Sequence, residues 1–381
     1  MTYRTRALEA TVRRYLSAFP VVGVTGPRQS GKSTMLKKLL DRSYRYVTFD
    51  DYRMVNLFHE DPEKFMRIYS DRVIFDEVQK VPEIFTYVKL SVDEDRQRYG
   101  KFVITGSSQF GFMKKVTESL AGRIGLLALL PFQFSEIPEK LRAESVFRGA
   151  YPEIVSRGYT MSPEWYSSYL ETYLSRDVRD LSNIVGMREF RKCLQLLAAR
   201  ISQILNMSEI ARDLGVTVPV VKKWISVLEA SYILFLVSPF YDNLGKRVIK
   251  SPKVYFFDTG LVSLLTGIEN ADLFEKGPMR GAIFENYVVS EILKRERHKG
   301  SSSELYYYRT SHGVEVDIII DRKSTKELVE IKSSETFRPE MVRTIQQLKK
   351  KDDEGYVVYR GKDLEYTDKI KIMDYRSFLS R

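Results

Sequence analysis

Residues 21–34 read VVGVTGPRQSGKST, and this run specifies the fold of the first part of the chain. Its first five residues are mostly β-branched and predict a short strand, and the residues from Ser33 to Leu40 have the pattern of a helix. Between them lies G-x-x-x-x-G-K-[ST], a glycine-rich loop whose backbone N–H groups can enclose phosphates. The dipole of the following helix adds to the attraction for negative charge. The sequence therefore predicts a strand–loop–helix unit that binds nucleotide phosphates.

Each residue of this loop is expected to take part in binding the nucleotide, which we expect to be ATP. The side chain of Lys32 is expected to reach the β- and γ-phosphates, and the hydroxyl of Ser33 is expected to bind Mg²⁺. The complete set of expected contacts is Gly26, Pro27, Arg28, Gln29, Ser30, Gly31, Lys32, Ser33 and Thr34.

Two carboxylates follow a second buried strand. Residues 72–77 read RVIFDE, an apolar run that ends in Asp76 and Glu77. Asp76 is expected to hold Mg²⁺ through water, and Glu77 is expected to orient and deprotonate the attacking water. A strand that ends in a solvated acidic turn is the alternative, and the glycine-rich loop upstream makes it the weaker one.

A third expected strand, Phe102–Thr105, runs into a polar turn beside this acidic pair. A polar side chain there can sense the γ-phosphate, and Ser107 is the first choice for that part, with Thr105 second. A plain turn without a function is the alternative.

Composition bounds the remaining possibilities. The 381 residues include 61 Lys and Arg against 50 Asp and Glu, which gives a net charge of +11. This balance favours an anionic partner such as nucleic acid or acidic lipid, although a solvated basic surface is an equal alternative. The single cysteine, Cys193, excludes an internal disulfide, and three histidines leave no zinc-type cluster. The sequence shows neither an apolar signal core nor a run of about 18 apolar residues, so we expect a cytoplasmic protein with no membrane partner.

Four segments are expected along the chain: an N-terminal helix at 1–20, an ATPase domain at 21–135, a helical and winged-helix domain at 136–275 and a nuclease-like domain at 276–381. Short apolar runs alternate with helical patterns in the second segment, which predicts a parallel sheet flanked by helices. Its expected strands are Val21–Thr25, Tyr46–Phe49, Val73–Phe75, Phe102–Thr105 and Leu126–Leu130. The fold class is therefore α/β.

The motifs together resemble the AAA+ branch of P-loop ATPases, in which a further strand separates the loop strand from the acidic strand. More narrowly, the runs GPRQSGKST from Gly26, FDEVQ from Phe75, ITGSS from Ile104 and LAGR ending at Arg123 resemble a prokaryotic family of ATPases. That family joins this domain to a C-terminal domain of unknown function. The resemblance implies a homo-oligomer, with a monomer as the alternative, and an arginine that completes the ATPase site. Arg123 is the first candidate for this arginine and Arg176 is the second; for either residue a surface ion pair is the alternative.

The middle segment contains a helix–turn–helix pattern. Ser208 is expected to cap its first helix, Gly215 to make the turn and Thr217 to cap the second helix. Core spacing on the second helix falls on Val220, Val221, Trp224, Ile225 and Leu228. Two strands, Tyr232–Val237 and Lys253–Phe257, are expected to form a wing, with Lys246, Arg247 and Lys250 in or near its loop.

This winged helix has two possible uses. In a DNA-binding role, Lys222 and Lys223 would enter the major groove and the wing lysines would contact phosphates. Winged helices also serve as lids and as protein-docking modules, and the second helix is poor in base-reading side chains.

The last segment carries carboxylates and a lysine in the order Glu285, Asp317, Glu330 and Lys332. Two residues apart on a strand, Glu330 and Lys332 project to the same face. This order resembles the PD-(D/E)xK nuclease superfamily. The resemblance implies that Asp317 and Glu330 are metal ligands, that Glu285 is an auxiliary ligand and that Lys332 positions a hydroxide. Surface ion pairs are the alternative.

The sequence therefore favours an ATP-hydrolysing protein that binds DNA, more readily than RNA, with a nuclease-like C-terminal domain that either cuts or only binds. A nucleotide-dependent switch that docks other proteins is the alternative from another class.

Overall fold

The computed structural model describes residues 3–106, 112, 115–116, 118–174, 186–240, 251–310, 313–367 and 369–381. These residues form two compact units. The first unit contains the chain up to Phe132, with Ala230–Tyr232 and Arg297–Gly300; the second unit contains Gln133–Glu229, Ile233–Glu296 and Ser301–Arg381.

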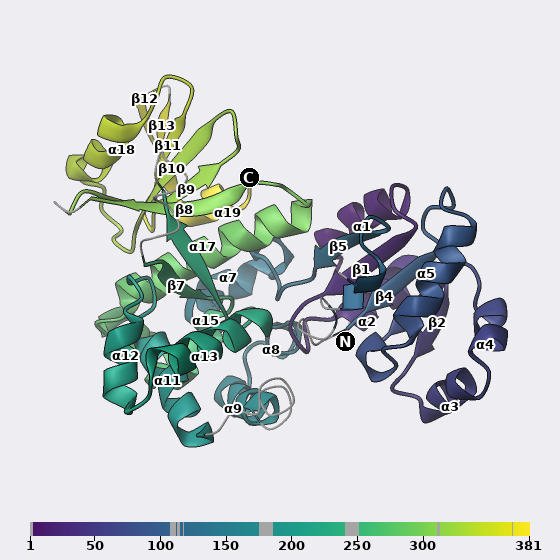
Figure 1. Ribbon diagram of the computed structural model, residues 1–381. Helices are drawn as coiled ribbons and strands as arrows, with labels where there is room; N and C mark the ends of the chain where they lie inside the picture. Colours follow the sequence, from purple (N-terminus) through teal and green to yellow (C-terminus); the bar gives the residue numbers. More distant parts are fainter. Residues whose placement is uncertain are drawn as a thin grey trace. The chain divides into compact units, whose positions relative to one another are not determined.

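A five-stranded parallel sheet forms the centre of the first unit (Figure 1). Its strands, in spatial order, are β2 (Arg45–Thr48), β3 (Val73–Asp76), β4 (Phe102–Thr105), β1 (Val21–Thr25) and β5 (Ile124–Ala128). Every neighbouring pair is parallel. The expected parallel sheet is confirmed, and β4 separates the loop strand β1 from the acidic strand β3.

Helices cover both faces of this sheet because both faces are apolar. On one face lie α1 (Leu8–Leu16) and α2 (Lys32–Leu40), whose Leu8, Val12, Met35 and Leu36 share a core with the strand residues Val22, Val24 and Val103. On the other face lie α3 (Tyr52–Glu60), α4 (Pro62–Ile68) and α5 (Ile84–Glu94), which pack on Val47, Phe75 and Ile104. A short 3-10 turn, η1 (Val78–Lys80), follows β3.

An eight-stranded mixed sheet lies in the second unit. Its strands, in spatial order, are β12 (Leu364–Thr367), β13 (Ile370–Asp374), β11 (Glu354–Tyr359), β10 (Lys326–Lys332), β9 (Glu315–Asp321), β8 (Glu304–Arg309), β6 (Leu234–Pro239) and β7 (Lys253–Phe256). The strands β8, β9 and β10 are antiparallel neighbours, whereas β10 and β11 are parallel.

The two strands expected to form a wing belong to this sheet. They pair antiparallel with each other, but β6 also pairs with β8 at Ser238↔Tyr306 and Pro239↔Tyr307. Because this pairing joins positions almost 70 residues apart, the local pattern gave no sign of it. The two strands therefore form an antiparallel pair that also extends the C-terminal sheet, and their use as a wing stays a prediction. The wing residues Lys246, Arg247 and Lys250 lie outside the described residues.

Three helices flank the sheet of the second unit. The turn η5 (Pro339–Val342) and helix α18 (Arg343–Leu348) bury Val342 and Ile345 against strand residues such as Val316 and Val357. The long helix α17 (Arg280–Lys299) meets α19 (Tyr375–Leu379) through Phe284 and Tyr375, whose ring centroids are 5.4 Å apart.

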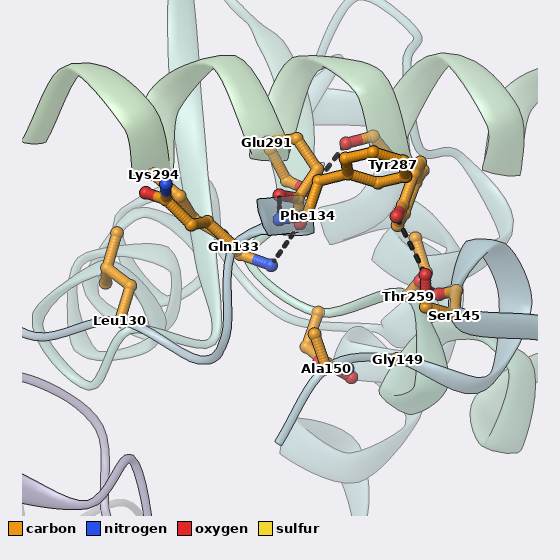
Figure 2. Close-up of polar contacts among 12 residues, drawn as sticks. Leu130, Gln133, Phe134, Ser145, Gly149, Ala150, Thr259, Tyr287, Glu291 and Lys294 are labelled. Carbon is orange, nitrogen blue, oxygen red and sulfur yellow. Dashed lines mark hydrogen bonds and ion pairs between the residues drawn. The ribbon is translucent and has the colours of Figure 1, made fainter. Parts of the chain in front are cut away.

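Buried polar contacts join α17 to the segment 133–145 (Figure 2). Glu291 accepts a hydrogen bond of 2.5 Å from the backbone N–H of Phe134 and one of 2.7 Å from Lys294 Nζ. The hydroxyls of Ser145 and Tyr287 are 2.8 Å apart. Burial raises the pKa of Glu291, and Lys294 opposes that rise. These contacts satisfy polar groups in the interior and fix the segment 133–145 on the helix.

The remaining elements of the second unit are helical. They are the turns η2 (Phe134–Glu136) and η3 (Glu139–Leu141) and the helices α7 (Arg142–Arg148), α8 (Pro152–Ser156), α9 (Ser162–Tyr173), α11 (Met187–Ala199), α12 (Met207–Leu214), α13 (Val218–Ala230), α15 (Thr259–Thr266) and α16 (Ala271–Lys276).

The helix–turn–helix geometry matches the sequence pattern in its turn and differs at its first cap. Gly215 ends α12 with a φ of +67°, as a left-handed cap requires. Asn206, and not Ser208, caps α12, because the Asn206 side chain accepts a hydrogen bond from Glu209 N. On α13 the side chain of Val227 is buried, whereas that of Val220 is only half-buried.

Candidate functional site

The glycine-rich loop has a backbone that only glycine accommodates at its start. Gly26 has a φ of +138°, and a Cβ atom there would lie 2.1 Å from the carbonyl oxygen of Leu129. Gln29 and Gly31 also have positive φ values, +60° and +92°, and α2 begins directly after Gly31. The loop therefore folds around the N-terminal end of α2, where backbone N–H groups have no partner within the helix.

Lys32 lies folded back into this loop. Its side chain is buried, and its Nζ donates hydrogen bonds of 2.9 Å to the carbonyl oxygens of Gly26 and Pro27. A buried ammonium group requires acceptors, and phosphate oxygens can replace these carbonyls when a nucleotide enters.

Ser33, Asp76 and Tyr46 meet at the carboxyl end of β3. Ser33 Oγ donates to Asp76 Oδ2 at 2.7 Å, and the hydroxyl of Tyr46 donates to the same oxygen. Burial and the Asp76 carboxylate together raise the pKa of Tyr46. The second oxygen, Asp76 Oδ1, is buried and has no hydrogen-bond partner among the described residues. Mg²⁺ prefers oxygen ligands. The Ser33 hydroxyl and the buried Asp76 Oδ1, which accepts no hydrogen bond from the described residues, are suitable ligands, so the residues present fit this ion.

Glu77 follows with a strained backbone. Its φ of +57° is in the left-handed region, which a residue with a side chain enters at a cost of about 1–2 kcal/mol. Gln79 Nε2 donates to Glu77 Oε2, and a Cβ atom on Gly106 would lie 2.7 Å from Gln79 Oε1. The side chain of Gln79 therefore links Glu77 to the end of β4. Ser107, the expected phosphate sensor, lies outside the described residues, and the hydroxyl of its alternative, Thr105, is buried with no partner among those described.

Arg123 lies at the other end of the sheet. It precedes β5, whose first residue Ile124 is in register with Val21, so Arg123 is at the amino ends of the strands. Its guanidinium group makes two contacts with Asp93, at 2.8 and 3.0 Å. The structure does not bring Arg123 to the glycine-rich loop of its own chain. Arg176 lies outside the described residues.

Arg6 was not identified from the sequence, yet its side chain binds the backbone of the glycine-rich loop. It is 3% exposed, and its guanidinium group donates to the carbonyl oxygens of Ser30 and Leu130, both at 2.7 Å. It also lies over the ring of Phe132 at 4.8 Å. These contacts cross 24 and 124 residues of chain, so no local signal points to them.

Tyr232 is a second contact that the sequence did not reveal. Its hydroxyl is 2.7 Å from Thr25 Oγ1, at the end of β1, where the glycine-rich loop begins. Its pKa is raised by burial.

The expected carboxylate–lysine residues share a cleft of about 490 Å³ in the second unit. Its lining consists of Ser202, Gln203, Ile204, Lys253, Glu285, Arg309, Glu315, Asp317, Glu330 and Lys332. Asp317 Oδ2 accepts a hydrogen bond of 2.7 Å from Ile331 N, which holds the two strands β9 and β10 at this point. Lys332 Nζ is 2.5 Å from Glu330 Oε1 and 3.8 Å from Asp317 Oδ2.

Burial dominates the electrostatics of these acids. It raises the pKa of Glu330 to about 8; the charge of Asp317 adds to that rise, and Lys332 opposes it. Burial also raises the pKa of Glu285, again with a contribution from Asp317. Glu330 Oε2 is buried and has no partner among the described residues.

Lys253, which was expected in a wing, lies inside this cleft. Its Nζ is 2.6 Å from Glu315 Oε1, 3.2 Å from Glu285 Oε1 and 4.0 Å from Asp317 Oδ1. Burial lowers the pKa of Lys253, but the surrounding carboxylates, Glu285 first, raise it further than burial lowers it. Over the described residues, no group of three or more His, Cys, Asp or Glu side chains is arranged to hold a metal ion. Glu285, Asp317 and Glu330 therefore line one cleft, where they form ion pairs with Lys253 and Lys332, and their role as metal ligands stays a prediction.

The second helix of the helix–turn–helix presents Lys222 and Lys223 at the surface, while Trp224 is buried against Phe190 with ring centroids 5.7 Å apart.

No helix among the described residues is long and apolar enough to span a membrane.

Family comparisons divide the chain into three parts. Residues 18–138 match the family described as AAA domain. Residues 139–272 and 280–378 match two families that are each described as a domain of unknown function, DUF8612 and DUF4143. The first unit thus contains an AAA-type ATPase domain, and this supports ATP binding.

Several whole proteins are similar to the chain. The uncharacterized protein Rv2008c of Mycobacterium tuberculosis is 30% identical over 338 residues, which cover 88% of this chain and 75% of that protein. An uncharacterized protein of Methanocaldococcus jannaschii is 23% identical over 343 residues, covering 81% and 73% respectively. Among solved structures, the Walker-type ATPase of Pyrococcus abyssi aligns with a TM-score of 0.47 at 15% identity, over 70% of this chain and 98% of that one.

Proposed function

Because the chain belongs to the family of AAA-domain proteins that includes the Mycobacterium tuberculosis protein Rv2008c, we propose that its nucleotide-binding ATPase domain controls binding of DNA by the second unit. The proposal has two parts. One concerns how this chain's own residues hydrolyse ATP, and the other concerns the partner of the second unit.

The contact that carries the first part is the hydrogen bond of 2.7 Å between Ser33 and Asp76. This hydrogen bond joins the end of the glycine-rich loop to the acidic strand β3, at the place where the β- and γ-phosphates of a bound nucleotide would lie. Ser33 and Asp76 would hold Mg²⁺ there, and the ion would neutralise charge on the phosphates. Lys32 would leave its two carbonyl partners and bind phosphate oxygens.

Glu77 is proposed as the base that orients and deprotonates the attacking water. Its left-handed backbone turns the chain sharply at the end of β3, and Gln79 holds its carboxylate. The proposed site thus has its acid and its base together at the end of β3 and its lysine at the start of α2, with Ser107 as the proposed phosphate sensor.

An arginine from a neighbouring copy is proposed to complete the site. Arg123 cannot serve the loop of its own domain because it lies at the opposite ends of the parallel strands. In a homo-oligomer, Arg123 or Arg176 can reach the site of the next copy, where such a residue contributes about 10³–10⁵ in rate. We expect Arg123→Ala to keep ATP binding and to lose turnover. Unchanged turnover would show that Arg123 does not complete the ATPase site.

DNA binding by the second unit is supported by charge and by surface placement. The chain carries a net charge of +11, and the helix–turn–helix exposes Lys222 and Lys223 on its second helix. Exposed lysines on such a helix are suited to phosphate and groove contacts. The C-terminal cleft, whose acids pair with lysines, is proposed as part of a nuclease-like binding module, without metal-dependent cutting.

The test is ATP turnover measured without DNA, with duplex DNA and with single-stranded DNA. The proposal expects turnover to change severalfold with one of the two DNAs. It also expects DNA binding, followed by fluorescence anisotropy, to weaken steeply between about 50 and 200 mM salt, because counterion release sets that slope. An ATPase that is indifferent to DNA and binds none would favour a switch that docks other proteins.

A further inference from the structure

Four carboxylates are packed closely in the cleft of the second unit, and this cluster cannot be stable by itself. Glu285 comes from α17, Glu315 and Asp317 come from β9, and Glu330 comes from β10. Asp317 is 6% exposed, and the other three side chains are half-buried. Like charges at this spacing in a low-dielectric site repel strongly, so the cluster requires cations or bound protons to offset its charge.

Lys253 supplies a cation from an unexpected element. It lies on β7, is 2% exposed, and has its Nζ between Glu285, Glu315 and Asp317 at 2.6–4.0 Å. On the same strand, Tyr255 donates a hydrogen bond of 2.8 Å to the Glu285 oxygen that faces Lys253.

The strand that carries Lys253 is fixed in place. Phe256 N donates to Asn286 Oδ1 at 2.7 Å, and Asn286 Nδ2 donates to Phe256 O at 3.0 Å, so β7 is tied to α17 beside Glu285. On its other side, Lys253 forms a bridge with Ile204. The backbone of Lys253 also pairs with that of Val237 on β6, so Lys253 lies between two backbone partners and is not a surface lysine that has folded inward.

We propose that Lys253 is an intramolecular counter-cation that takes the place of a divalent metal ion in this cluster and keeps such an ion out. Three oxygens face it, Glu315 Oε1, Glu285 Oε1 and Asp317 Oδ1. A metal ion shared by these acids would need such oxygens within about 2.0–2.6 Å. The other oxygen of Asp317 already accepts from Ile331 N. A metal ion therefore enters only if Lys253 leaves.

This inference does not depend on ATP hydrolysis, because it concerns only the cleft of the second unit. Its consequence for the chain is a nuclease-like cluster that cannot activate water through a bound metal while Lys253 remains. Removing the ammonium group should convert the cluster into a divalent-cation site.

The experiment compares the 381-residue chain with its Lys253→Met variant, both without nucleotide and both carrying Asp76→Asn to remove the nucleotide site. Mn²⁺ binding is measured by electron paramagnetic resonance, and thermal unfolding is followed in EDTA and in excess Mn²⁺. We expect no tightly bound Mn²⁺ with Lys253 present. The Lys253→Met variant should bind one Mn²⁺ and gain roughly 5 °C or more at a hundredfold excess over Kd.

Two matched variants complete the test. Lys276→Met removes an exposed lysine that pairs with Asp272 at 2.6 Å, and it should leave both Mn²⁺ binding and unfolding unchanged. Adding Asp317→Asn to Lys253→Met should abolish the new Mn²⁺ site.

The proposal is overturned if the protein with Lys253 intact binds Mn²⁺ in a manner that Asp317→Asn abolishes. It is also overturned if a folded Lys253→Met variant takes up no Mn²⁺. If the Lys253→Met variant does not fold in EDTA, recovery of its folding on addition of Mn²⁺ supports the proposal. If Mn²⁺ does not restore folding and the protein with Lys253 binds Mn²⁺, the proposal is contradicted.

Discussion

Replacing Arg6 tests whether the N-terminal segment sets the shape of the nucleotide loop. The Arg6 guanidinium group donates two hydrogen bonds of 2.7 Å, to the carbonyl oxygens of Ser30 and Leu130. Ser30 lies inside the glycine-rich loop, so its carbonyl fixes the orientation of the peptide that precedes Gly31. In Arg6→Ala neither carbonyl retains this donor, and the ring of Phe132 no longer has a cation over its face.

The size of the effect follows from these interactions. A hydrogen bond from a charged group contributes about 1.5–3 kcal/mol, and a buried cation over an aromatic ring about 1–2 kcal/mol. Part of this is offset because the buried guanidinium group gives up its hydration. We therefore expect Arg6→Ala to lower the free energy of unfolding by about 2–4 kcal/mol, and the affinity for ATP to fall about tenfold because the loop is no longer held in its binding shape.

The assay is urea unfolding together with titration by a fluorescent ATP analogue at a temperature where the variant is fully folded. Arg6→Lys should recover little, because an ammonium group cannot bridge two carbonyls as the planar guanidinium group does. The control is Arg4→Ala, since Arg4 is exposed on the same segment. If Arg6→Ala binds ATP as tightly as Arg4→Ala does, the proposed role of Arg6 in shaping the loop is refuted.

Three further predictions concern the second unit. The pKa of Glu330 is raised in the folded protein, so the folded state holds this proton more tightly, and the free energy of unfolding should fall as pH rises above the ordinary value of 4.5. Glu330→Gln should reduce that fall, as measured by urea midpoints at about pH 5 and pH 8; an unchanged slope would contradict the assignment. Changing both Lys222 and Lys223 to Glu should weaken DNA binding and reduce the salt slope by about 0.9 for each phosphate that the helix no longer neutralises, and an unaltered slope would exclude this helix from the interface. Asn206→Ala should cost about 1 kcal/mol of stability whereas Ser208→Ala costs less, and the reverse order would contradict the observed cap.

Much of the first unit follows from local sequence because its signals are local. The strands β1 and β4 have the expected bounds, and the loop between β1 and α2 is specified by a glycine pattern that needs no distant information. Ser33 and Asp76, expected to share one ion, do lie 2.7 Å apart, because carboxyl ends of parallel strands share one edge of the sheet.

The residues that the sequence did not reveal all act over long distances along the chain. Arg6 contacts Leu130, Tyr232 contacts Thr25, and Lys253 contacts Asp317. Lys253 lies in the C-terminal sheet because β7 pairs with β6 and β6 pairs with β8. The sequence around Lys253, two strands joined by a basic loop, is instead typical of a wing. An ion pair of this kind has no spacing rule, so the order of the acids along the sequence does not reveal that Lys253 lies among them.

Whether the glycine-rich loop and the acidic strand hydrolyse ATP is decided by Mg²⁺-dependent ATP binding and turnover, measured for the unaltered chain, for Lys32→Ala and for Glu77→Gln. The unaltered chain should bind ATP and hydrolyse it. Lys32→Ala should lose most of its affinity, and Glu77→Gln should keep affinity while turnover falls by about 10²-fold or more. Undiminished turnover in both variants, or no affinity of the unaltered chain for any nucleoside triphosphate, would contradict the account.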